Sequence, residues 1–132
     1  MRPTTIAEVA SRAAAGGGVF DRAVREFVDF WQSASTDERR KALAREPAKL
    51  DGVKDAYLAA LTEHLALSAR IDVPEWSEKD ARFLKEPFFA GGIESLKAIL
   101  LVESPLAFRR RLIFISADAL SRPRRDFARD PA

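Results

Sequence analysis

Hydrophobic residues recur every three or four positions along much of the chain, which is the spacing of one face of an α-helix. The clearest run lies in residues 20–34, with apolar positions at Phe20, Val24, Phe27, Val28 and Trp31. A second stripe continues to about Ala69 and consists of Val53, Tyr57, Ala60, Leu61, His64 and Leu65. Each pattern predicts an amphipathic helix whose apolar face is buried.

Polar residues indicate where two other helices begin. Thr5 with Glu8, and Ser35 with Glu38, have the spacing of a capping box, in which each side chain bonds to the backbone N–H of the other residue. They predict helices that start at these points, the second of them ending before Pro47.

The pattern changes at residues 71–76, because Pro74 lacks a backbone N–H and biases the preceding residue away from a helix. Beyond this boundary we predict a short helical turn from Ser77 to about Leu84, a buried helix from Ile93 to Val102, and a helix that starts at Ser104-Pro105 and ends near Arg111. Residues 112–115 are β-branched and aromatic, and their periodicity leaves open whether they continue that helix or form an extended piece.

These signals predict an all-α protein: a single compact helical domain of five to seven helices, allowing one short extended segment near the C-terminus. We expect an N-terminal helical part in residues 1–70 and a C-terminal helical module in residues 71–122. Residues 123–132 are charged and follow a proline, so we expect a disordered tail.

Composition narrows the function classes. The 132 residues suffice for one core, and the absence of cysteine excludes disulfides, thiolate zinc sites and cysteine nucleophiles. No signal peptide or membrane span is expected, so we expect a cytoplasmic protein. The formal net charge is only +2, although arginines gather near the C-terminus.

Little in the sequence indicates catalysis. His64 is the single histidine, so a Ser-His-Asp triad or a two-histidine metal site would need a partner chain. Acidic residues cluster around Trp76, but their spacing fits no calcium loop. We therefore expect no enzyme activity, no cofactor and no metal site.

Two groups of residues are candidates for binding a partner. The rings of Trp76, Phe88 and Phe89 lie among proline and glycine, where they either plug the core or anchor another protein. Arg109, Arg110 and Arg111 form either a solvated helix face or an interface that attracts anionic groups. We predict these six residues as the partner-binding site, with the arginines solvated in the free protein.

The opening "TIAEVASRAAAGGGVF", residues 5–20, resembles the DNA-binding domain of lac-repressor-type regulators. That resemblance implies a recognition helix after the glycines. However, three glycines leave the turn poorly fixed, and the following helix balances its charges where phosphate binding requires excess cations. We interpret residues 20–34 as a core helix instead.

A second resemblance covers residues 74–121. "VPEW", "RFLKEPFF" and "IESLKAILLVESPLAFRRRLIFISADALSRPRR" resemble a segment of small bacterial proteins that accompany nucleotidyltransferase-like genes, some of which look like antitoxins or regulators. The resemblance implies a non-catalytic antitoxin-like protein that neutralises a cognate protein toxin by occluding its site. A DNA- or RNA-binding regulator that uses the arginine-rich region is the alternative, with nucleic acid the less favoured partner. The oligomeric state stays open.

Overall fold

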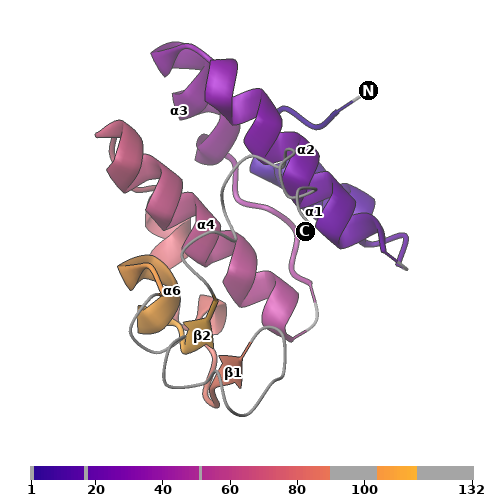
Figure 1. The fold of residues 1–132 in the computed structure, drawn as a ribbon, viewed down its shortest axis with the longest axis vertical. Helices are drawn as coiled ribbons and strands as arrows, with labels where there is room; N and C mark the ends of the chain where they lie inside the picture. Colours follow the sequence, from indigo (N-terminus) through magenta and orange to yellow (C-terminus); the bar gives the residue numbers. More distant parts are fainter. Residues whose placement is uncertain (1, 17, 51, 90–103, 116–132) are drawn as a thin grey trace, which may run out of the picture.

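The computed structural model describes residues 2–16, 18–50, 52–89 and 104–115, and the protein is all-α (Figure 1). Five α-helices occur in these residues: α1 (Ile6–Ala13), α2 (Val19–Ser33), α3 (Thr36–Ala44), α4 (Val53–Ala69) and α6 (Leu106–Arg110). Two 3₁₀ turns follow α4, η1 (Glu75–Glu78) and η2 (Asp80–Arg82), and two short strands complete the fold, β1 (Phe88–Phe89) and β2 (Ile113–Phe114). The predicted fold class is confirmed.

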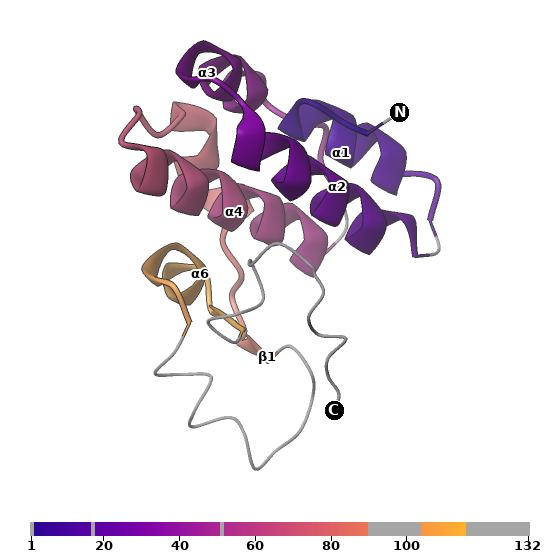
Figure 2. The same ribbon diagram turned by 45° about the horizontal axis from the view of Figure 1, so that its top comes forward.

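Helix α4 is the centre of the molecule. α1, α2 and α3 lie on one side of it and α6 lies on the other (Figure 2). Because α4 is covered from both sides, its buried residues extend well beyond the predicted stripe and include Asp55, Thr62 and Glu63. Of the predicted stripe, Ala60, Leu61 and Leu65 are buried, whereas Val53, Tyr57 and His64 are only partly buried, so the prediction was correct for half of its positions.

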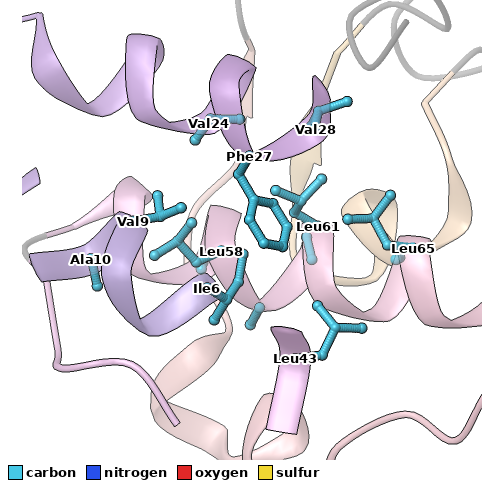
Figure 3. Close-up of a cluster of buried hydrophobic side chains, with 14 of the residues drawn as sticks. Ile6, Val9, Ala10, Val24, Phe27, Val28, Leu43, Leu58, Leu61 and Leu65 are labelled. Atoms are coloured by element: carbon cyan, nitrogen blue, oxygen red, sulfur yellow. The ribbon is translucent and has the colours of Figure 1, made fainter. Parts of the chain in front are cut away.

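The core of the N-terminal part surrounds Phe27. Its ring points from α2 into the space between α1 and α4 (Figure 3), and the side chain is fully buried. All five apolar positions predicted for residues 20–34 are buried. This confirms that α2 directs its apolar face to the core.

The predicted caps start both helices, with one difference. At α3 both halves of the capping box form, since Ser35 N–H donates to Glu38 Oε1 at 2.7 Å and Glu38 N–H donates to Ser35 Oγ at 3.2 Å. At α1 Thr5 accepts the Glu8 N–H, but the Glu8 carboxylate accepts the Thr4 N–H at 2.8 Å. That bond lowers the pKa of Glu8.

The alternative left open at residues 112–115 is resolved by β2. Leu112 adopts the left-handed backbone region, with φ at 63°, and so ends the helical path. Strand β2 then pairs in parallel with β1, Phe88 opposite Ile113 and Phe89 opposite Phe114. The helix predicted to start at Ser104-Pro105 begins at Leu106 without a side-chain cap. The Ser104 hydroxyl instead accepts the Ile115 N–H at 2.8 Å and donates to the Ile115 carbonyl at 2.9 Å.

The predicted boundary at residues 71–76 does not divide the core. Buried Trp76, Phe108 and Ile113 belong to the same hydrophobic cluster as the residues of α1 to α4. Three predictions lie outside the described residues: the helix from Ile93 to Val102, the end of the family segment at Ser116–Ser121, and the tail 123–132. Among the described residues, no helix has the length and apolarity needed to cross a membrane.

Candidate partner-binding surface

Helix α6 packs one side against α4 and leaves the other in solvent. Ala107 and Phe108 are buried, and the Phe108 ring meets the Tyr57 ring edge-on with centroids 5.1 Å apart. On the outer side, Leu106 is 57% exposed and Arg109 is exposed as well. The two residues are three positions apart, so they share a face of the helix.

Strand β1 lies beside the residues that follow α6. Leu112 connects the two elements, since its N–H donates to the Arg109 carbonyl at 2.9 Å and its carbonyl accepts the Phe88 N–H at 2.8 Å. Phe88 is 41% exposed, whereas Phe89 is half-buried and stacks on Phe114 with ring centroids 4.9 Å apart. We call Phe88, Leu106 and Arg109 the α6 face.

Arg111 is not part of this surface, and the prediction that it is solvated is wrong. Its side chain is fully buried, with Nη1 2.6 Å from Glu63 Oε1 on α4. It also donates to the carbonyls of Ala107 and Ser77, at 2.9 and 2.7 Å, and its guanidinium lies 4.4 Å from the Phe83 ring centre. Arg111 therefore joins α4, η1 and α6 to one another.

Arg110 is exposed, as predicted, but two carboxylates already neutralise its charge. It reaches Glu63 Oε2 at 2.6 Å and Glu78 Oε1 at 2.9 Å. The hydrogen bonds to Glu78 and Glu63 raise the pKa of Arg110, and the bond from Arg110 lowers the pKa of Glu78. Among the described residues, Arg109 alone of the three arginines has no carboxylate partner.

Trp76 also lies apart from the α6 face. It is buried against α3, with its Nε1–H donating to the Leu43 carbonyl at 3.0 Å and the Arg82 guanidinium 5.1 Å from its ring centre. A Trp with its ring buried and its N–H satisfied belongs to the core. The structure thus brings the segments Phe88–Phe89 and Arg109–Arg111 close to each other through the Leu112 backbone, buries Arg111 away from the surface, and places Trp76 against α3.

The sequence reasoning missed a second buried ion pair. Arg82 of η2 donates to Asp55 Oδ1 on α4 at 2.5 Å, and both side chains are almost fully buried. Arg82 also reaches Glu46 Oε2 at 2.9 Å, and Lys79 binds the other oxygen of that carboxylate. These bonds, from Lys79 first and Arg82 second, lower the pKa of Glu46. The available signal was the presence of two carboxylates, Asp55 and Glu63, eight residues apart in a predominantly apolar helix.

The residues that the sequence offered as candidates for catalysis or metal binding are His64 and the acidic residues around Trp76. His64 is half-buried with its ring 6.2 Å from that of Phe108, and burial lowers the pKa of His64. Of the acidic residues around Trp76, Glu78 pairs with Arg110, while Asp72 and Glu75 are exposed. In the part of the chain that the structure describes, no group of three histidines or carboxylates could hold a metal ion.

The outer surface of α2 is charge-balanced, as the sequence indicates. Arg2 pairs with Asp29 at 2.6 Å, and Arg12 of α1 lies 3.7 Å from Glu26. Binding to phosphates requires an excess of cations, whereas Asp29 and Glu26 place carboxylates among the cations of this surface.

Comparisons of the chain with protein-family models, with curated proteins and with solved structures find no match.

Proposed function

We propose that the protein is a non-catalytic, antitoxin-like protein that binds a cognate protein toxin through the α6 face and occludes its site. The observation that carries the proposal is the exposure of two large apolar side chains, Phe88 and Leu106, beside an arginine without a carboxylate partner among the described residues. Aromatic, apolar and arginine side chains are typical anchors of protein interfaces.

The surroundings of the α6 face support this reading. Arg111 and Phe108 hold α6 on α4, so the face is ordered before a partner arrives. A preorganised surface loses less conformational entropy on binding. Arg109 suits a toxin whose site is lined by carboxylates, as the metal-binding site of a nucleotidyltransferase-like enzyme would be.

The same geometry counts against nucleic acid as the partner. Binding to phosphates depends on a local excess of cations. Around α6 the carboxylates of Glu63 and Glu78 neutralise Arg110 and Arg111, which leaves only Arg109 for a phosphate among the described arginines of this cluster. A protein partner needs no such excess.

Co-expression with the product of the adjacent gene tests the proposal, scored by growth and by co-purification. We expect Arg109→Glu and Leu106→Asp each to abolish rescue, because truncating or reversing a central anchor commonly costs about 2 kcal/mol or more of binding free energy. Both side chains are exposed, so the fold should be retained.

Two matched controls make the test specific. Leu67→Asp alters another exposed leucine, 53% exposed on α4, and Arg25→Glu reverses an exposed charge on α2. Both controls should rescue growth at the wild-type level. If the α6-face variants also rescued growth, the α6 face would not be the toxin-binding site. If Arg109→Glu instead lost affinity for nucleic acid, the alternative function as a DNA- or RNA-binding regulator would be favoured.

A further inference from the structure

A groove lies between α3 and residues 71–76, near the end of α4. Its volume is about 450 Å³. The apolar part of its lining consists of Leu43, Ala44, Ile71, Pro74 and Trp76. The groove is separate from the α6 face, because α3 and α6 lie on opposite sides of α4 (Figures 1 and 2).

The two walls of the groove carry opposite charges. Arg40 lies on the α3 wall, while Asp72 and Glu75 lie on the other wall, and all three side chains are exposed. Among the described residues Arg40 pairs only with Asp37, at 3.4 Å in an exposed contact. Such a contact contributes little stability, so Arg40 can exchange it for another carboxylate.

This charge pattern restricts what can cover the groove. A partner of one sign would be repelled by one wall, as nucleic acid would be by Asp72 and Glu75. A surface with a cation on one wall and carboxylates on the other is complementary to itself. In a two-fold symmetric contact both copies use the same surface, so every pair of residues that meets across the interface occurs twice.

We propose that this groove is a self-association surface, on which a second copy of the chain docks about a two-fold axis. Arg40 of each copy then pairs with Asp72 and Glu75 of the other, and the accessible apolar residues of the lining, Ala44, Ile71 and Pro74, face their counterparts in the second copy. The pairing is independent of the proposed function and leaves the α6 face of each copy free. A dimer of this kind would present two α6 faces.

Sedimentation equilibrium of the full chain tests the proposal, over concentrations from about 1 to 500 µM so that dissociation constants up to roughly millimolar are detected. The wild type should form a dimer. We expect Arg40→Glu to lower the association constant at least about tenfold, because it places like charges opposite one another twice per dimer. The double variant Asp72→Arg, Glu75→Arg should do the same.

Mixing these two variants gives the decisive measurement. In the mixed dimer Glu at position 40 faces two arginines, and the native Arg40 of the other chain faces the native carboxylates, so association should return to the wild-type level. Lys41→Glu, the same charge change at an exposed neighbour on α3 that does not line the groove, is the control and should leave association unchanged.

Three results would overturn the self-association surface. They are a wild type that stays monomeric throughout, variants that do not associate when mixed, and a Lys41→Glu effect as large as that of Arg40→Glu. Far-ultraviolet circular dichroism of each variant verifies the fold, which exposed substitutions of this kind should leave intact.

Discussion

At the scale of single residues, three adjacent arginines have three different environments. Arg109 is exposed, Arg110 bridges Glu63 and Glu78 at the surface, and Arg111 is fully buried on Glu63. Neighbours in sequence on a helix point about 100° apart, so identity of side chain does not imply identity of role. Reversing the charge of all three together would therefore test the fold and the surface at once.

Separate substitutions distinguish these roles. We expect Arg111→Glu to lower the free energy of unfolding by about 3–5 kcal/mol, because it removes a buried pair and sets two carboxylates against each other. Arg109→Glu should change it by less than about 0.5 kcal/mol, since that side chain is exposed. Urea denaturation measures both values. Equal stability of the two variants would contradict the assigned burial of Arg111.

His64 predicts a pH dependence of stability. Burial lowers the pKa of His64 below the ordinary 6.5, so the unfolded chain binds a proton more readily than the folded one. The free energy of unfolding should thus fall as the pH drops below about 6.5, in the window between the unfolded and the folded pKa of this residue. Glu46 and Glu78 have pKa values below 4.5, so their titration changes the free energy of unfolding only in more acid solution. In His64→Gln the decrease between about pH 7 and pH 5 should be smaller than in the wild type.

At the scale of elements, α2 is a core helix. Trp31 is buried, its ring centre lies 6.2 Å from that of Phe27, and Arg39 of α3 stacks 5.0 Å from it while donating to the Trp31 carbonyl. We expect Trp31→Ala to cost about 3–5 kcal/mol of unfolding free energy, the usual result of truncating a large buried ring. Gln32→Ala, at an exposed neighbour, should cost little. A stable Trp31→Ala variant that had lost only DNA binding would instead make α2 a recognition helix.

Elements that depend on local signals were predictable from the sequence. The Ser35 and Glu38 capping box needs only a three-residue spacing, and the buried face of α2 needs only its periodicity. The environment of Arg111 was not predictable, because its partner Glu63 lies 48 residues away and Ser77 lies 34 residues away. The exposed pair Leu106 and Arg109 follows from the helix predicted after Ser104-Pro105, whereas the pairing of β2 with β1 after that helix does not.

At the scale of the whole molecule, long-range contacts connect the part before residue 71 to the part after it. Arg82 and Arg111, from two later segments, bind Asp55 and Glu63 of the same helix α4. Trp76 donates its N–H to Leu43 of α3 across 33 residues. Buried ion pairs are costly to separate, because each half would be left as an unpaired charge in the interior. The two parts should therefore unfold together.

The two tryptophans allow this cooperativity to be measured, since Trp31 lies in α2 and Trp76 lies in η1, within the module predicted to begin at residue 71. Trp76→Phe leaves Trp31 as the only indole, and Trp31→Phe leaves Trp76. Within each variant, urea unfolding followed by fluorescence should give the same midpoint as unfolding followed by far-ultraviolet circular dichroism, as a two-state transition requires. Comparing the two probes within one variant removes the effect of the substitution itself on stability. Trp76 fluorescence that changes at lower urea than the helical signal would show η1 leaving α4 first, and the charged contacts through Asp55 and Glu63 would then be too weak to unite the two parts.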